Sequence, residues 1–177
     1  IYVASDIHGC FDKYRALLNR LKLKDDDMLY ILGDLVDRGD GGIKIILDLV
    51  SRKNVVCLRG NHDHEAYLLL KYFAARPGER TVDSLTEAFQ LWLSDGGETT
   101  FRSFLEIDED QKKKVLTFLG SLPFRRELEI NGKKYHLSHT VPEKEKMLRS
   151  DRCRITDFII GEPDYEKVYF KDTVLVT

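Results

Sequence analysis

Short apolar runs alternate with helical patterns through the first third of the chain. The runs at residues 1–5, 28–32 and 55–58 are rich in Ile, Val and Leu. Between them, apolar residues recur at helical spacing in Phe11–Leu21 and over residues 43–50. Strands joined by helices in this order are typical of a largely parallel sheet. The pattern therefore predicts an α/β fold.

The middle of the chain, about residues 64–122, predicts a helical insertion or cap. Helical spacing covers residues 66–75, 99–105 and 109–119, and Pro77-Gly78 marks a break after the first of these. A further helix is expected to open at the capping box of residues 84–87 and to end at Gly96-Gly97.

Strands resume after the insertion. Residues 128–130 and 134–138 are separated by Asn131-Gly132, a strong signal for a two-residue hairpin turn. A last apolar run at residues 173–176 predicts another strand. No repeat or flexible linker interrupts the pattern, so we expect residues 1–177 to form a single domain.

Composition and charge narrow the classes of partner. The chain has 177 residues, of which 42% are hydrophobic, and this excludes disorder. Its formal net charge of -2 offers no general attraction for nucleic acid or an anionic membrane, and no apolar run reaches the ~18 residues of a membrane helix. We expect neither partner. The 3 cysteines are widely spaced, which favours reduced thiols and a cytoplasmic location, with a mature secreted chain stripped of its leader as the alternative. The oligomeric state stays open.

Candidate chemistry follows the strands. In open α/β sheets ligands bind outside the carboxyl ends of the strands, and four polar runs occupy such positions. These runs would pool oxygen and imidazole donors without any thiolate: Asp6, His8, Asp34, Asn61 and His139. Such a set suits manganese, iron or zinc. Five ligand groups exceed what one open catalytic site takes, so two divalent metal ions are predicted, with Asp34 as a bridge.

The other polar residues of these loops suit hydrolysis at phosphorus. Two metal ions stabilise the attacking and leaving oxygens of an in-line displacement by an activated water. Arg38 can bind a phosphoryl group through two parallel hydrogen bonds from its guanidinium. His62 is placed to protonate the leaving oxygen as general acid, and Asp37 is the candidate carboxylate that orients it.

Three motifs in this order resemble the signature of the calcineurin-like metallophosphoesterases, in their phosphoprotein phosphatase branch. They are Asp6-Ile7-His8-Gly9, the run from Gly33 to Gly39, and Gly60-Asn61-His62-Asp63, at intervals of about 25 residues. The segments at 92–97 and 122–123, and the segment at 135–139, resemble bacterial members of that branch. The likeness thus covers nearly the whole chain.

The resemblance implies an α/β/β/α sandwich with a helical insertion, and it implies roles for single residues. Asp6, His8 and Asp34 would hold one metal ion, and Asp34, Asn61 and His139 the other. His62 and Asp37 would be catalytic. Phosphate would be bound by Arg38, Asn61 and a further arginine, for which Arg152 is the preferred match and Arg154 the alternative.

One departure concerns the end of the chain. The family supplies another histidine in a Gly-His-Thr segment after a late strand, whereas this sequence stops at Thr177, directly after such a strand. The closing strands of the second sheet would also be missing. We expect the natural chain to continue, because a strand this apolar would otherwise be an exposed edge. The other interpretation is a second metal site that lacks one ligand.

Three functions are compatible with these motifs. The main expectation is a phosphatase acting on phosphate monoesters, with phosphoserine or phosphothreonine in proteins as the family-based substrate. An alternative is hydrolysis of dinucleoside polyphosphates, which related bacterial enzymes perform with the same core. A third is a catalytically weak phosphate-binding domain with an incomplete metal site. A deep basic pocket with stacking aromatics would favour nucleotides, and a shallow cleft would favour proteins.

Several residues invite a functional role that ordinary packing explains better. Trp92 is expected in the core of the cap, and Cys10 is expected to pack at the start of a helix. His64 and His136 match no required position, so we expect them at the surface or supporting the site from behind. Lys112-Lys113-Lys114 is expected to be a solvated helix face.

Overall fold

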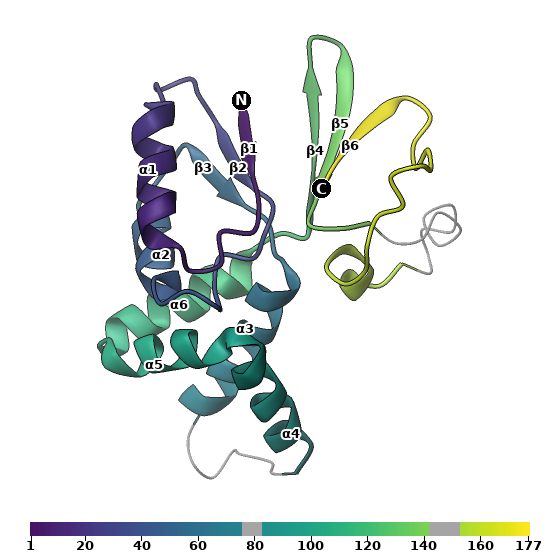
Figure 1. Ribbon diagram of the computed structural model, residues 1–177. Helices are drawn as coiled ribbons and strands as arrows, with labels where there is room; N and C mark the ends of the chain where they lie inside the picture. Colours follow the sequence, from purple (N-terminus) through teal and green to yellow (C-terminus); the bar gives the residue numbers. More distant parts are fainter. Residues whose placement is uncertain (76–82, 142–152) are drawn as a thin grey trace.

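A parallel sheet forms the first layer of the molecule. In the computed structural model, which describes residues 1–75, 83–141 and 153–177, β1 (Tyr2–Ala4), β2 (Leu29–Ile31) and β3 (Val55–Cys57) pair in the order β1-β2-β3. Tyr30 is paired with Val3 on one side and with Val56 on the other. Figure 1 shows the sheet beside the helices that connect its strands. The parallel order confirms the predicted α/β class.

Two crossover helices cover one face of this sheet. They are α1 (Phe11–Leu21), whose N-cap is Cys10, and α2 (Gly42–Leu49). Tyr14 of α1 and Ile43 of α2 are buried in one apolar cluster with Leu29 and Ile31 of the central strand. The apolar stripes read from the sequence therefore face the sheet, and Cys10 opens a helix as expected.

The helical insertion contains α3 (Asn61–Ala74), α4 (Asp83–Trp92), α5 (Glu98–Glu106) and α6 (Glu109–Ser121), with a π-helical turn at Leu93–Gly97 between α4 and α5. Helix α3 begins at Asn61 rather than near residue 64, because the Asp63 carboxylate accepts the Gly60 N–H and caps the helix. Helix α4 begins just before the predicted capping box, and the side chains of residues 84–86 of that box and the Pro77-Gly78 break lie outside the described residues.

The second sheet is mixed. Strands β4 (Arg125–Ile130) and β5 (Lys133–Ser138) are antiparallel, and β6 (Thr173–Val176) pairs with β5 in parallel. Asn131 and Gly132 form the turn with φ values of 52° and 73°, as the hairpin signal requires. Strand β4 starts three residues before its predicted start, and β6 has the predicted bounds.

The two sheets share a second apolar cluster. Tyr30 and Leu32 at the central strand, with Leu58 after β3, are buried against Leu137 of β5. The sheets stand side by side in Figure 1, with α1 and α2 on the far side of the first sheet. This helix–sheet–sheet layering confirms the metallophosphoesterase-type architecture that the sequence resemblance implies.

His136 faces away from that cluster. It is buried between the rings of Phe158 and Phe170, at centroid distances of 6.2 and 4.9 Å, and its Nδ1 lies 2.5 Å from Glu127 Oε1. Phe158 belongs to a short 3-10 helix, Ile155–Phe158. The expectation of a surface position for His136 is therefore wrong, because this segment covers the outer face of β5.

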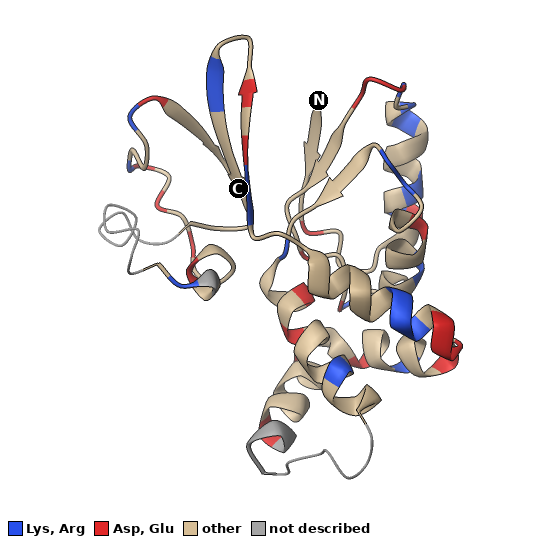
Figure 2. Cartoon of the chain, turned by 180° about the vertical axis from the view of Figure 1, so that it is seen from behind, with Lys and Arg blue, Asp and Glu red and all other residues tan. Residues whose placement is uncertain are grey.

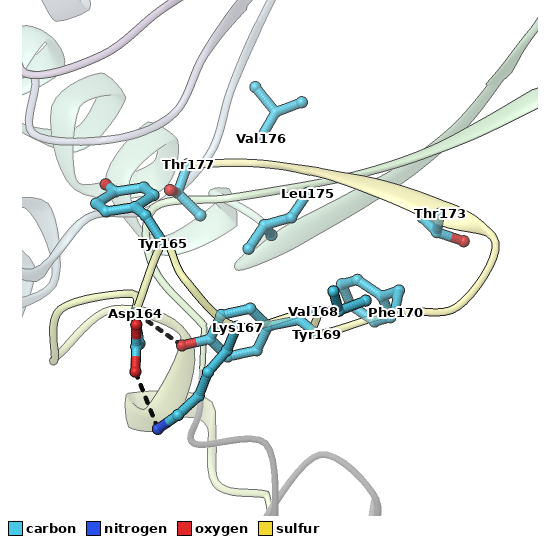
Figure 3. A pocket seen from close by; sticks show the side chains of 10 residues that line it. All are labelled: Asp164, Tyr165, Lys167, Val168, Tyr169, Phe170, Thr173, Leu175, Val176 and Thr177. Atoms are coloured by element: carbon cyan, nitrogen blue, oxygen red, sulfur yellow. Dashed lines mark hydrogen bonds and ion pairs between the residues drawn. The ribbon is translucent and has the colours of Figure 1, made fainter.

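Two surface features lie away from the strand ends that carry the polar motifs. A pocket of about 400 Å³ lies between residues 164–170 and β6, where Asp164 pairs with Lys167 (Figure 3). Its lining contains none of the candidate site residues. The lysines of α6 lie next to acidic residues in the first turn of that helix, and Lys112 pairs with Glu109 at 2.8 Å (Figure 2). A solvated face of mixed charge explains them.

No helix within residues 1–75, 83–141 or 153–177 combines the length and the apolar character needed to cross a bilayer.

The cluster between the sheets predicts a specific stability loss. Leu137→Ala should lower the free energy of unfolding by about 3 kcal/mol, because it removes buried methyl groups and leaves a cavity. Val168→Ala, at an exposed position, is the control and should change it by less than about 0.5 kcal/mol. Urea denaturation measures both, and equal effects would contradict the assigned inter-sheet packing.

Candidate functional site

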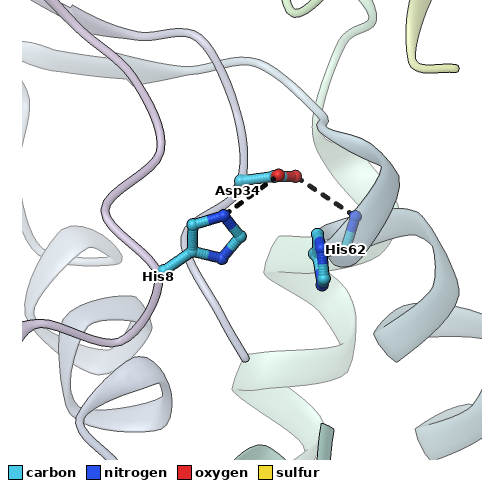
Figure 4. Close-up of side chains that lie close together, drawn as sticks. All are labelled: His8, Asp34 and His62. Carbon is cyan, nitrogen blue, oxygen red and sulfur yellow. Dashed lines mark hydrogen bonds and ion pairs between the residues drawn. The ribbon is translucent and has the colours of Figure 1, made fainter. Parts of the chain in front are cut away.

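Four polar loops meet at the carboxyl ends of the strands. Asp6 and His8 follow β1, Asp34 follows β2, and Asn61 opens α3 directly after β3. His139 follows β5 of the second sheet. In Figure 4 the side chains of His8 and His62 lie on either side of the Asp34 carboxylate. Residues up to 133 positions apart in sequence are thus brought to one place, as the strand-end argument predicts.

His8 is oriented by the backbone. Its Nδ1 lies 3.1 Å from the Val36 carbonyl oxygen, which can only accept, so Nδ1 carries the proton and Nε2 keeps its lone pair. That Nε2 lies 3.5 Å from Asp34 Oδ2 and 3.8 Å from Asp6 Oδ1. An imidazole fixed in this way is the usual state of a metal ligand, whose other ring nitrogen donates to an acceptor.

His139 repeats the same arrangement on the other side of Asp34. Its Nδ1 donates to the Leu32 carbonyl at 3.0 Å, and its Nε2 lies 3.6 Å from Asp34 Oδ2 and 2.9 Å from Asn61 Oδ1. The 2.9 Å separation of His139 Nε2 and Asn61 Oδ1 is also one that two ligands of a single cation adopt. Ligand atoms about 2.0–2.2 Å from one ion, at a right angle, are about 3 Å apart, so these residues fit a metal ion.

Asp34 is shared by both sets of donors. Ligand atoms within 4.8 Å of one another form two groups, His8 with Asp34 and His62, and Asp6 with Asp34 and His139. These groups divide the residues differently from the sequence-based assignment, which placed Asp6 with His8 and gave His62 no metal. The Asp34 side chain is only 4% exposed, and its Oδ2 lies within 3.6 Å of Nε2 of both His8 and His139, while its Oδ1 accepts the His62 backbone N–H. The geometry therefore supports a shared carboxylate.

Arg38 reaches across the two histidines that flank Asp34. Its Nη1 donates to His8 Nε2 at 2.9 Å, and its Nη2 donates to His62 Nε2 at 3.2 Å. A guanidinium in this position directs two parallel N–H groups over the donor cluster. This arrangement suits two-pronged recognition of a phosphoryl group.

His62 is held by a buried carboxylate. Its Nδ1 lies 2.8 Å from Asp37 Oδ2, and the two side chains are 3% and 0% exposed. The hydrogen bond to Asp37 is the main cause that raises the pKa of His62 above its usual value, against the effect of burial. Its Nε2 faces the donor cluster and lies 3.7 Å from the exposed carboxylate of Asp95. This imidazole can therefore carry a proton that points at the site.

Asp63 ties two of the loops together. Its carboxylate accepts the backbone N–H groups of Asp34, Leu35 and Gly60 at 2.8–3.0 Å, so it joins the loop after β2 to the start of α3. Burial and the nearby Asp34 charge raise its pKa to about 6, although these hydrogen bonds oppose the shift. Asp63 therefore braces these two loops through backbone hydrogen bonds.

The backbone of the site is strained. Five of its non-glycine residues have φ between 43° and 68°, in the left-handed region that side chains disfavour: Asp6, His8, Asp34, Asp37 and Arg38. Such conformations persist only where the surroundings enforce them, and they concentrate at functional sites. Here the enforcing contacts include the Asp63 hydrogen bonds and contacts from the helical insertion.

Hydrogen bonds from the insertion hold the loop that carries Asp37 and Arg38. The Arg38 N–H donates to the Gly96 carbonyl, the Asp37 N–H to Thr100 Oγ1, and Thr99 Oγ1 to the Gly39 carbonyl, each at 2.9 Å. Gly96 has a φ of 100°, and a Cβ there would lie 2.7 Å from the Arg38 nitrogen. The sequence predicts no role for these residues. The one signal for them was the run from Trp92 to Gly97, which resembled the family without an assigned purpose.

The remaining candidates lie elsewhere. Arg152 is outside the described residues. Arg154 is exposed at the start of the 3-10 helix, where its backbone N–H donates to Asp157. His64 is half-buried beside Arg59 and Phe124 and contacts none of the donors described above. Cys10, at the N-cap of α1, is half-buried and unpaired.

Comparison with known proteins identifies the family to which this chain belongs. The model of the calcineurin-like phosphoesterase family matches residues 1–175. A symmetrical bis(5'-nucleosyl)-tetraphosphatase from Buchnera aphidicola subsp. Schizaphis graminum is 36% identical over 130 residues, which cover 70% of this chain and 45% of the relative. The enzyme of the same name from Salmonella paratyphi A is 35% identical over 126 residues, covering 69% and 43%. The chain thus spans less than half the length of either relative.

A solved structure shows the same fold. A candidate diadenosine tetraphosphatase superposes with a TM-score of 0.51 at 23% identity, covering 81% of this chain and 50% of its own. A protein serine/threonine phosphatase from Saccharomyces cerevisiae gives a TM-score of 0.47 at 19% identity, covering 94% and 45%.

The Asp63 hydrogen bonds predict a second stability difference. Asp63→Asn places an amide N–H against backbone N–H donors in a buried position, so it should lower the free energy of unfolding by about 3 kcal/mol. Asp6→Asn is the matched control, because Asp6 is 58% exposed and Asn tolerates its left-handed backbone. Urea denaturation in the presence of a chelator compares them. A loss at Asp6 as large as that at Asp63 would refute the role given to Asp63.

Proposed function

Because the chain belongs to the calcineurin-like phosphoesterase family, we propose that it hydrolyses phosphate esters or anhydrides with two divalent metal ions, and that dinucleoside polyphosphates are its substrates. The observation that carries the substrate class is the similarity to two symmetrical tetraphosphatases over a stretch of 126–130 residues. The initial expectation of phosphoserine and phosphothreonine substrates has no comparable support. The alternative drawn from the sequence is therefore preferred.

We assign the metal ions to the donors around Asp34. His8 and Asp6 would hold one ion and Asn61 and His139 the other, with Asp34 between them, because both histidines present Nε2 toward its carboxylate. Manganese, iron and zinc all accept this mixture of imidazole and oxygen donors. When bound, such ions polarise the phosphoryl group and activate water for in-line attack.

The protein's own residues supply binding and proton transfer. Arg38 would release the two histidine nitrogens and bind the phosphoryl oxygens with its paired N–H groups. His62, with Nδ1 held by Asp37, would donate the Nε2 proton to the leaving oxygen. In a dinucleoside polyphosphate this leaving oxygen belongs to a phosphate. The buried carboxylate keeps the imidazole in the orientation that points this proton at the site.

A cavity adjoins the loops that carry His8 and Arg38, and we propose that it receives further phosphates of the substrate. It measures about 420 Å³, within the range of small-molecule pockets, and begins where Gly9 and Gly39 adjoin His8 and Arg38. Its lining carries two positive and two negative side chains, together with one aromatic ring: Lys13, Lys44, Asp12, Asp40 and Phe11. The lysines offer charge for phosphates beyond the one that reacts.

A substrate panel tests the proposed class. With manganese present, we expect kcat/KM for diadenosine tetraphosphate to exceed that for a panel of phosphoserine and phosphothreonine peptides by at least about tenfold, and we expect two molecules of ADP as products. Chromatography of the nucleotides and a phosphate-release assay give both rates. Higher kcat/KM for the peptides would overturn the dinucleotide proposal in favour of a protein phosphatase, and metal binding without any turnover would favour the weak phosphate-binding domain.

Metal stoichiometry tests the two-ion site without measuring activity. Isothermal titration with Mn²⁺ should give two ions per chain for the wild type, one for His139→Ala, and no tight binding for Asp34→Asn, because Asp34 is shared. His64→Gln is the control and should keep both ions, since His64 contacts none of the proposed ligands. One ion in the wild type, or two ions retained in Asp34→Asn, would contradict the shared carboxylate.

A further inference from the structure

Trp92 ends α4 and is buried in the helical insertion, where it was expected to serve packing alone. Its indole Nε1–H nevertheless donates to Asp37 Oδ2 at 2.8 Å. The same oxygen accepts the hydrogen bond from His62 Nδ1, also at 2.8 Å. One carboxylate oxygen thus connects the core of the insertion to the imidazole at the site.

The orientation of the Asp37 carboxylate depends on these two donors. The side chain is fully buried, and its other oxygen, Oδ1, has no hydrogen-bond partner among the residues that the structure describes. Only the backbone N–H of Asp37 is held separately, by Thr100 Oγ1. Without the indole N–H, His62 would be the one side-chain donor to the Asp37 carboxylate among the described residues. The carboxylate would then lack an independent contact that fixes its orientation toward His62.

The position of the indole is itself fixed by packing. Its ring lies 6.0 Å from Phe89 and 6.3 Å from Phe101 between centroids, and the backbone of Gly97 packs directly against it, with no room for a Cβ. Buried Trp side chains need an acceptor for their N–H. Here the acceptor is the carboxylate that contacts His62, so the rigid aromatic cluster and the site share one hydrogen bond.

We propose that Trp92 is a positioning residue for proton donation by His62, acting through Asp37 Oδ2. The inference rests on the proposed function, which gives His62 the protonation of the leaving oxygen. In that step the Nε2–H bond of His62 breaks and an O–H bond forms on the leaving group. Asp37 stays ionised and Trp92 keeps its proton, so both act only by holding the imidazole in line.

Leaving-group dependence separates this role from packing. Trp92→Phe keeps an aromatic ring but removes the N–H donor. We expect kcat for phenyl phosphate, a poor leaving group that needs an acid, to fall about tenfold to a hundredfold with KM unchanged. For p-nitrophenyl phosphate, whose leaving group needs little protonation, the loss should be much smaller. An equal loss on both substrates, or no loss, would overturn the proposal.

A double-mutant comparison tests the route through His62. His62→Ala alone should lower the phenyl phosphate rate by about 10²–10⁴-fold. Adding Trp92→Phe to it should cause no further loss, because the group that Trp92 positions is absent. A further tenfold loss in the double variant would show that Trp92 acts elsewhere. Phe101→Leu is the packing control, since it disturbs the cluster but leaves the N–H, and it should not change the ratio of the two substrate rates.

The indole resonance provides a readout without turnover. Trp92 is the only tryptophan, so a ¹H–¹⁵N spectrum contains one indole peak. Asp37→Asn should move the indole N–H proton resonance upfield, because a neutral amide accepts a hydrogen bond more weakly than a carboxylate. In Phe101→Leu the chemical shift of this proton should stay that of an N–H bonded to a carboxylate. An unmoved peak in Asp37→Asn would refute the hydrogen bond.

The same variants distinguish failure of the proposed function from failure of the inference about Trp92. A full rate in His62→Ala would remove His62 from proton donation and overturn both claims. A lost rate in His62→Ala together with a full rate in Trp92→Phe would overturn the inference about Trp92 alone.

Discussion

The site depends on the hydrogen bonds that the buried Asp63 carboxylate accepts from the ends of two neighbouring strands. By taking the N–H groups of Asp34 and Leu35 together with that of Gly60, it fixes the loop after β2 against the first turn of α3. The Asp34 carboxylate then accepts the His62 N–H at 3.2 Å and lies between His8 and His139. The parallel sheet brings the loops to one edge, and this clamp sets their separation.

The helical insertion completes the site. Its π-helical turn and the start of α5 hold the loop of Asp37 and Arg38 from below, where both residues have left-handed backbones. Each hydrogen bond is modest in net free energy, but together they enforce a conformation that the residues would not adopt alone. The aromatic cluster around Trp92 supplies the rigid base for these contacts. Packing in the insertion and geometry at the site are thus coupled through short hydrogen bonds.

Much of this arrangement could be predicted from the sequence. The apolar runs indicated the parallel strands, Asn131-Gly132 indicated the hairpin, and polar residues after strands indicated which loops meet. The start of α3 at Asn61 could not be predicted, because it depends on the capping hydrogen bond from the Gly60 N–H to the Asp63 carboxylate. The contacts of Trp92 and Thr100 with Asp37 join residues 55–63 positions apart, and no local pattern reports them. The proposed substrate class likewise rests on comparison with relatives, since the motifs alone are compatible with several phosphoesters.

The central claim is that one buried carboxylate, Asp34, is shared by two metal ions. Anomalous diffraction from crystals of the chain grown with Mn²⁺ tests it most directly, because the anomalous map locates the ions without assuming a mechanism. The account predicts two peaks, on either side of the Asp34 carboxylate and in contact with His8 and His139. A single peak, or two peaks that do not share Asp34, would contradict it.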